Sequence, residues 1–430
     1  MIDSRIPGFY KLPPESRLAE LSTRFGLTPH DLAILRDGGS LDLARADKMV
    51  ENCIGVLGLP VGLGLNFVIN GQDYVVPMAV EEPSIVAAVS HIARLVRDHG
   101  GFVADADPAV MIAQVQVVDV PDLAAAEQAL WAGRAHLLAR ANAMHPGLAA
   151  RGGGARDIEV RVFKTPHPML VLHLLVDCCD AMGANAVNTM AEGVAPLVEA
   201  MTHGRVCLRI LSNLADRRLA RAACSIPEEA LQTKDFTGPE VADGIVQAAR
   251  FAAVDPYRAA THNKGVMNGI DAVAVATGND WRGVEAGAHA YAARGGRYTS
   301  LTEWWREGGR LHGRIELPLA VGTVGGSTGV HPTIGVLRKL LGIDSARELA
   351  GVMAAVGLSQ NLGAIKALAT EGIQRGHMSL HARQVALAVG AEGELVDRVA
   401  RVLVERGEIK ADAARAVLAE LSAVDPAGAR

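Results

Sequence analysis

Residues 108–215 carry strand and helix patterns in an order that few folds can accommodate. Short segments alternate apolar and polar residues, and longer segments between them have the composition and spacing of helices. The patterns predict strand, helix, strand, strand, helix and strand in chain order, over residues 111–120, 121–149, 156–163, 169–177, 184–203 and 204–214. This βαββαβ order is that of ferredoxin-like domains. We therefore predict an inserted ferredoxin-like domain over residues 108–215.

Residues 81–101 carry a strong helix signal outside that domain, and residues 12–27 carry a second one. Pro83 can occupy the first turn, apolar residues then recur at helical spacing, and two glycines end the pattern. Glu81 and Glu82 would lie at the positive end of this helix, where a pair of acids ordinarily does no more than compensate the helix dipole.

The remaining chain predicts a larger mixed region and a small helical unit. Residues 376–430 contain two or three short amphipathic patterns joined by turns that contain glycine. We predict an α/β (α+β) fold in which residues 1–107 and 216–375 form a large domain. In that arrangement residues 376–430 form a C-terminal helical unit that can move.

Composition limits the partners of this chain. Its net charge of -5 comes from 42 basic and 47 acidic residues without long runs of either sign, which argues against nucleic-acid and anionic-membrane partners. The N-terminus has no apolar segment typical of a signal peptide, and glycines and a proline interrupt the longest uncharged run, residues 52–72. The 5 cysteines form no CxxC pair, so we expect a reduced cytoplasmic protein with structural thiols.

The stretch THNKGVMNGIDAVAVATGNDW, residues 261–281, places one amine in an apolar segment punctuated by glycine. Its glycines allow sharp turns or a close approach of the backbone to a ligand. From this stretch alone, Lys264 is a lysine on a solvated loop and Asp280 caps a helix. The alternative is a pocket that holds both side chains.

Two glycine-containing stretches are candidates for anion or cofactor binding. DCCDAMGAN places Asp180, Gly183 and Asn185 after a predicted strand and at the start of a predicted helix, where backbone N–H groups can bind phosphate or carboxylate. VGTVGGSTG, residues 321–329, offers a backbone without side chains that could lie against a flat or anionic ligand. A tight turn explains either stretch equally well. No GxGxxG follows a strand, so a Rossmann site is not predicted.

His377 and His381 lie four residues apart and would share one face of a helix. Such a pair can bind a metal, but no third ligand has a matching spacing and neither histidine lies in an HExxH motif. We therefore predict no metal site. His377 follows a glycine, which is consistent either with a surface histidine near a turn or with one that reaches a cleft.

Taken together, these stretches resemble the hydroxymethylglutaryl-CoA reductase family. The matching motifs are EEPS (81–84), DAMGAN (180–185), THNKG (261–265), GND (278–280), VGTVGGST (321–328) and TEGIQRGHM (370–378), in the family's order. His173 precedes DAMGAN at the family's distance. The chain is similar to the class II (bacterial, soluble) members over essentially its whole length.

The resemblance implies four catalytic residues, Glu82, Lys264, Asp280 and His377. Each hydride addition to a thioester or aldehyde builds negative charge on oxygen, which a buried Lys264 ammonium would stabilise. Asp280 would keep that amine charged, and Glu82 would supply a proton. His377 would protonate the departing CoA thiolate.

The resemblance also implies ligand contacts. Contacts with the hydroxymethylglutaryl group fall on Ser84, Arg258, Asn268 and Gln360. Arg258 is suited to binding the free carboxylate through two parallel hydrogen bonds of its guanidinium. Contacts with the nicotinamide cofactor fall on Asp180, Met182, Gly183, Asn185, Gly322, Val324, Gly325 and Gly326.

His145 bears on the choice between NAD and NADP. NADH-using class II enzymes can place an acidic residue near the adenosine ribose, where it accepts from the 2′-OH and repels a 2′-phosphate. A count without gaps puts His145 at that position, although a helix-end residue without ligand contact is an equal alternative. Its nearest arginines are Arg140 and Arg151. We predict that NAD(H) is favoured and NADP(H) tolerated, with no metal.

The resemblance thus predicts interconversion of hydroxymethylglutaryl-CoA with mevalonate and CoA, in either physiological direction. It implies a homodimer or a multiple of dimers whose active site lies between subunits, and a C-terminal flap that closes over the substrates. The alternatives are a Schiff-base lyase that uses Lys264 and a CoA-ester-binding protein without turnover.

Overall fold

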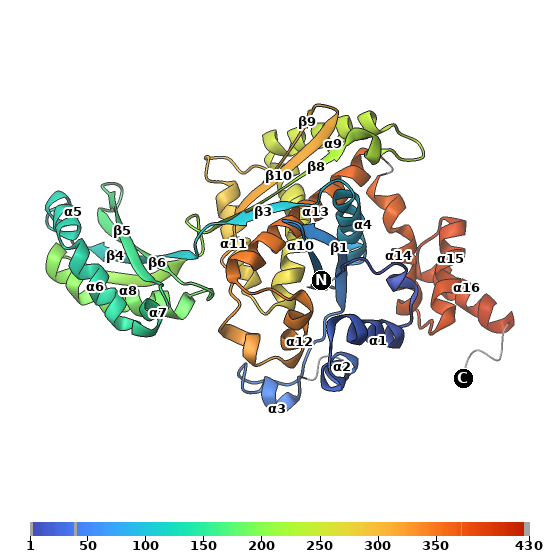
Figure 1. The fold of residues 1–430 in the computed structure, drawn as a ribbon, viewed down its shortest axis with the longest axis horizontal. Helices are drawn as coiled ribbons and strands as arrows, with labels where there is room; N and C mark the ends of the chain where they lie inside the picture. The colour runs from blue at the N-terminus through green and yellow to red at the C-terminus, as the bar shows by residue number, and fades with distance from the viewer. Residues whose placement is uncertain (1–2, 38–40, 371, 425–430) are drawn as a thin grey trace.

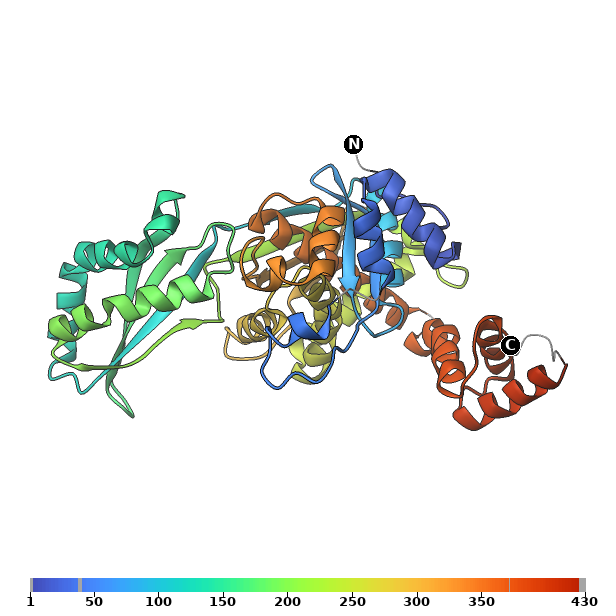
Figure 2. The same ribbon diagram turned by 90° about the horizontal axis from the view of Figure 1, so that it is seen from below.

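The structure is a computed structural model that describes residues 3–37, 41–370 and 372–424, with side chains described except at 327–328, 373–380 and 423–424. It has a central α/β body with an inserted domain at one end and a group of helices at the other (Figures 1 and 2). The predicted α/β (α+β) class with a ferredoxin-like insertion and a C-terminal helical unit is confirmed.

The body contains two antiparallel sheets. One is the hairpin β1 (Val61–Ile69) and β2 (Gln72–Ala79), and the other has the order β3-β8-β10-β9. The strands of the second sheet are β3 (Val103–Ala106), β8 (Leu219–Pro227), β9 (Thr302–Glu307) and β10 (Arg310–Pro318). The larger helices of the body are α4 (Ile85–Arg97), α9 (Gly238–Val254), α10 (Pro256–Ala276), α11 (Trp281–Ala292), α12 (Pro332–Leu341) and α13 (Ala346–Ala369).

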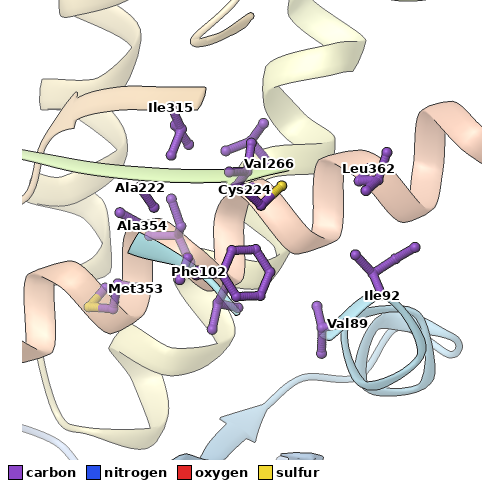
Figure 3. Close-up of a cluster of buried hydrophobic side chains, with 14 of the residues drawn as sticks. Val89, Ile92, Phe102, Ala222, Cys224, Val266, Ile315, Met353, Ala354 and Leu362 are labelled. Atoms are coloured by element: carbon purple, nitrogen blue, oxygen red, sulfur yellow. The ribbon is translucent and has the colours of Figure 1, made fainter. Parts of the chain in front are cut away.

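Helix α13 runs through the core of the body. Met353, Ala354 and Leu362 on this helix lie among apolar side chains from α4, β8, β10 and α10 (Figure 3). Among the described helices, α13 is the one that is long and apolar enough to cross a membrane. Within its apolar 18-residue segment, 67% is buried inside the protein. A helix that is apolar on all sides needs such surroundings, and here the protein core supplies them.

The N-terminal region packs against one side of the body. It contains η1 (Phe9–Lys11), α1 (Pro14–Phe25), α2 (Pro29–Arg36) and α3 (Leu43–Ala46). Thr28 and Asp31 form a capping box at the start of α2, and Lys339 of α12 donates to Asp31 at 2.7 Å. This pair ties the N-terminal helices to α12. Short 3₁₀ turns elsewhere are η2 (Glu228–Leu231) and η3 (Gly326–Gly329).

The inserted domain has the predicted ferredoxin-like topology. Its elements are β4 (Val110–Val118), α5 (Leu123–Ala132), α6 (Arg134–Met144), α7 (Pro146–Ala150), β5 (Gly154–Phe163), β6 (Met169–Asp177), α8 (Ala184–Thr202) and β7 (Arg205–Ser212). The sheet order is β5-β6-β4-β7 and all pairs are antiparallel. The segment 121–149 is helical as predicted, and Gly133 and the His145–Pro146 junction divide it into three helices.

The C-terminal unit consists of α14 (Ile373–Ala388), α15 (Glu394–Arg406) and α16 (Ala411–Val424). Its helices share an apolar core of their own around Ala386, Val399 and Leu403. Helix α14 begins at Ile373, about one turn before the predicted boundary at residue 376. The inserted domain and these three helices lie at opposite ends of the body (Figures 1 and 2).

Candidate active site

Glu82 and Lys264 meet although 182 residues separate them in the chain. Lys264 Nζ donates to Glu82 Oε2 at 2.8 Å, and the side chains are 60% and 41% exposed respectively. The amine is therefore paired with a carboxylate, but it is not the buried ammonium that the resemblance implied. The reason is that nothing in the described chain covers this part of α10.

The segment that carries Glu82 differs from its prediction. Helix α4 begins at Ile85, so Pro83 precedes the helix instead of forming its first turn. Ser84 is the N-cap residue and has a φ of 75°, a left-handed conformation that is uncommon for residues other than glycine. Glu82 consequently lies on the turn between β2 and α4 and pairs with Lys264 instead of only compensating a helix dipole.

The stretch 261–281 is mostly helix. Helix α10 continues to Ala276, so Lys264 lies on a helix instead of a loop, and Gly265 lies mid-helix beside open space. The sharp turn comes at Gly278, whose φ is 72°. This turn joins α10 to α11.

In this structure Asp280 does not contact Lys264, so the pairing of the two stays a prediction. Its Oδ1 accepts from the Gly283 N–H at 3.1 Å, so the exposed Asp280 caps α11. Glu82 takes the predicted place of Asp280 beside the amine. The neighbouring Asn279 has a role that the sequence did not reveal, since its Oδ1 accepts from Gly322 N at 2.7 Å and links this turn to the glycine stretch 321–326.

A cavity of about 1670 Å³ opens on the Glu82 side of this pair, and Lys264 is not among the residues that line it. Glu82, Ser84, Gly278 and Asn279 line it together with apolar side chains of the N-terminal region, β1 and α12. Charged side chains also line the cavity, among them Arg5, Arg17, Arg36, Arg94 and Asp98. A cavity with both apolar and charged walls suits a long ligand that has apolar and polar parts. Arg258, Asn268 and Gln360 do not line this cavity.

The predicted carboxylate ligand Arg258 is half-buried on the first turns of α10. No hydrogen bond or ion pair joins it to another described residue, and burial lowers its pKa from the usual value. Gln360 on α13 is buried, and its Oε1 has no partner among the described residues. Asn268 lies one turn beyond Lys264. Polar groups without partners in this region are free to bind a ligand.

The two glycine-containing stretches meet at the junction of the inserted domain and the body. Ala181 and Val324 form a parallel β-bridge, and Thr323 N donates to Asp180 O at 2.8 Å. A Cβ on Gly322 would lie 2.5 Å from Met182 N, so only glycine permits this approach.

The exposed sides of these stretches remain open to a ligand. Gly325 and Gly326 have positive φ angles and free space where a side chain would project. Gly183 caps α8 with a φ of 101°, and Asn185 is exposed in its first turn. The Asp180 carboxylate, by contrast, accepts from Ala346 N at 2.9 Å and so binds the start of α13. The backbone of both stretches thus fits a flat, anionic ligand.

A pair of acidic side chains that the sequence did not reveal lies between α10 and α11. Burial, and secondarily a hydrogen bond to Glu285, raise the pKa of Asp271 to about 9. Glu285 Oε2 lies 2.5 Å from His289 Nε2, and His289 Nδ1 lies 2.7 Å from the Tyr298 hydroxyl. Burial beside the Glu285 carboxylate therefore favours the protonated form of Asp271.

Two predicted residues remain to be placed. His377 lies in α14, and its side chain is outside those that the structure describes. His145 is half-buried at the α6–α7 junction, and the Arg151 guanidinium lies 3.9 Å from where a Cβ on Gly147 would be. Among the described side chains, no group of three or more His, Cys, Asp or Glu could hold a metal ion.

Comparison with known proteins identifies the family. Residues 14–382 match the family model for hydroxymethylglutaryl-coenzyme A reductase. A 3-hydroxy-3-methylglutaryl-coenzyme A reductase of Archaeoglobus fulgidus is 51% identical over 424 residues, which are 98% of this chain and 95% of the relative. A probable reductase of Borreliella burgdorferi is 34% identical over 79% of this chain and 77% of its own.

Solved structures agree. A reductase from Streptococcus pneumoniae has a TM-score of 0.83 and 40% identity, covering 96% of this chain and 99% of its own. The class II enzyme of the same organism, bound to NADPH in open conformations, has a TM-score of 0.82 and 42% identity over 85% of this chain and 99% of its own. The matches span the body, the inserted domain and the candidate site alike, and the chain belongs to the hydroxymethylglutaryl-coenzyme A reductase family.

Proposed function

We propose that this chain interconverts hydroxymethylglutaryl-CoA with mevalonate and CoA through two successive hydride transfers. Family membership supports the reaction. The observation that carries the proposal is the Glu82–Lys264 pair at 2.8 Å, beside a cavity of about 1670 Å³ that can hold a CoA ester. When bound, the nicotinamide cofactor supplies hydride to the carbonyl carbon.

Lys264 stabilises the oxyanion that each reduction builds. An ammonium aimed at developing negative charge is most effective when water is excluded, so the exposed Lys264 must be covered in the working enzyme. Glu82 pairs with the amine at rest. Its carboxyl is within hydrogen-bond reach of the amine that holds this oxygen, so after Glu82 has taken up a proton from water it passes that proton to the alkoxide.

The remaining roles follow the family pattern. Asp280 approaches Lys264 only after the α10–α11 turn shifts, and His377 protonates the CoA thiolate when α14 closes over the site. Arg258 binds the free carboxylate, with Ser84, Asn268 and Gln360 completing the substrate contacts. Residues 1–107 and 216–375 bind the CoA ester, residues 108–215 bind the cofactor, and residues 376–430 act as the flap.

We also propose a homodimer in the cytoplasm. The segment 49–61 exposes a run of apolar side chains, including Ile54 at 98% and Leu57 at 93% exposure, and an exposed apolar patch of this kind marks an interface. The inserted domain and α14 lie at opposite ends of one chain, so a second subunit is needed to bring a cofactor domain and a flap to the same site. An active monomer in sedimentation at assay concentration would contradict this.

The cofactor that we propose differs from the NAD(H) preference predicted from His145. The relative from Streptococcus pneumoniae was solved with NADPH, and the Arg151 guanidinium lies near Gly147 without a described partner. A cation there favours a 2′-phosphate. We therefore propose that NADP(H) is used at least as well as NAD(H). Arg151→Ala should lower kcat/KM for NADPH more than for NADH, and an equal effect on both would contradict the assignment.

The decisive experiment is a spectrophotometric assay of NADPH and NADH oxidation on addition of hydroxymethylglutaryl-CoA. Turnover that yields mevalonate and free thiol supports the reaction. Substrate binding without oxidation of either cofactor would instead indicate a CoA-ester-binding protein. Trapping of Lys264 by borohydride in the presence of substrate would indicate a Schiff-base lyase.

A further inference from the structure

Arg218 lies where the chain returns from the inserted domain to the body, between β7 and β8. Only 5% of the residue is exposed. Its Nη1 donates to the carbonyl oxygens of Ala181 at 3.2 Å and Met182 at 3.3 Å, and its Nη2 donates to Val321 O. The guanidinium thus joins two stretches that lie far apart in sequence.

No ion pair joins Arg218 to a described carboxylate, and burial lowers its pKa from the usual value. A buried cation with only backbone partners costs free energy, so its position requires a compensating role. The guanidinium instead donates to the buried carbonyl of Val321 and to the partly buried carbonyls of Ala181 and Met182. A planar guanidinium can donate to all of them at once, whereas the single ammonium of lysine cannot keep this geometry.

The two glycine-containing stretches that Arg218 joins approach each other closely, and further hydrogen bonds connect them to the body. Gly322 approaches the backbone of Met182 so closely that a Cβ would clash at 2.5 Å. Asn279 joins Gly322 to the turn that carries Asp280, and Asp180 joins the same contact to the start of α13. The position of the glycine stretches is therefore coupled to the candidate catalytic turn.

We propose that Arg218 is a positioning residue for the nicotinamide cofactor. Its guanidinium donates to backbone carbonyls, so it acts through the stretches that it joins. It fixes the stretches 180–183 and 321–326 in register, so that their open backbone is preorganised before the cofactor binds. Preorganisation lowers the ordering cost of binding and therefore raises affinity. The inference rests on the proposed function, because it assumes that these stretches hold the cofactor.

The test is Arg218→Lys in the full chain. This substitution retains the positive charge but loses the planar set of N–H donors of the guanidinium. NADPH and NADH dissociation constants are measured by quenching of protein fluorescence, and KM for hydroxymethylglutaryl-CoA by steady-state assay. We expect cofactor dissociation constants to rise at least about tenfold, which corresponds to 1.4 kcal/mol, while the KM for the CoA ester changes less than about threefold. An arginine with a purely structural role would alter both the cofactor dissociation constants and the KM for the CoA ester, or it would alter neither. Either of those results would overturn the proposal.

Arg221→Lys is the matched control. Arg221 is another arginine near the start of β8. It is less buried than Arg218 and pairs with Asp107 at 2.8 Å and Glu316 at 2.7 Å instead of donating to the glycine stretches. Its cofactor affinity should stay within about twofold of wild type, and a tenfold loss there would also overturn the proposal. If Arg218→Lys does not fold, Gly322→Ala separates the same stretches and carries the same expectations.

The outcome for the wild-type protein separates this inference from the proposed function. A wild-type chain that binds neither NADPH nor NADH refutes both. A wild-type chain that binds and uses the cofactor, with an Arg218→Lys variant of equal affinity, refutes only the positioning role.

Discussion

Replacing Lys264 with alanine should greatly lower catalytic activity while leaving the stability of the fold almost unchanged. The Lys264–Glu82 pair is 60% and 41% exposed, so water screens it and its contribution to folding is about 1 kcal/mol or less. In the covered active site the same ammonium faces an oxyanion, where removal of a single neutral donor already costs about 10²- to 10³-fold in kcat. For a charged donor we expect a loss of about 10³-fold or more.

The assay compares two half-reactions in Lys264→Ala: reduction of hydroxymethylglutaryl-CoA and reduction of free mevaldehyde. Both should fall by about 10³-fold, because each builds the same oxyanion, while the midpoint of thermal unfolding barely changes. Arg314→Ala is the matched control, since Arg314 pairs with Glu303 at 2.7 Å and is 61% exposed. A Lys264→Ala variant that keeps a tenth of either activity would refute the oxyanion role.

Further predictions concern the histidine, the acidic pair, the substrate arginine and the flap. His377→Gln should damage the steps that handle CoA thiol and spare mevaldehyde reduction, and equal loss of both would remove it from that role. The pKa of Asp271 is raised to about 9 by burial and Glu285, so the folded state retains a proton that the unfolded chain loses near pH 4. Stability should therefore fall as pH rises from about 4 to 9, and thermal melts of Asp271→Asn should lose this slope. Arg258→Lys should raise the KM for hydroxymethylglutaryl-CoA about tenfold or more with little change in kcat, and an unchanged KM would exclude the carboxylate contact. Truncation just after Ser379 should abolish turnover, and full activity in the truncated chain would exclude flap closure.

Local sequence patterns were sufficient for the inserted domain. The second half of β4 alternates between buried and half-buried residues, β6 is a continuous apolar run, and α8 has an apolar stripe, so much of the signal for these elements lies within each element. One local signal was missed: Asn70 and Gly71, with φ angles of 52° and 79°, form the two-residue turn of the β1–β2 hairpin. Asn-Gly between two apolar runs predicts such a turn.

The residue types of the candidate site were evident from short motifs, but their partners were not. Glu82 and Asp280 were both carboxylates that could pair with Lys264, and no periodicity distinguishes a partner 182 residues away from one near in sequence. The fold decides the matter, because the β2–α4 turn places Glu82 beside α10 while the helix start at Asp280 uses its carboxylate as a cap.

The sequence by itself determined the class of fold, the order of the domains and the residue types that the chemistry requires. Tertiary structure alone decided that Lys264 is exposed, that Arg218 joins the two glycine stretches, and that Asp271 meets Glu285. The physical reason is that helix and strand patterns are set by neighbours in the chain, whereas pairing and burial of polar groups depend on which distant segments come together.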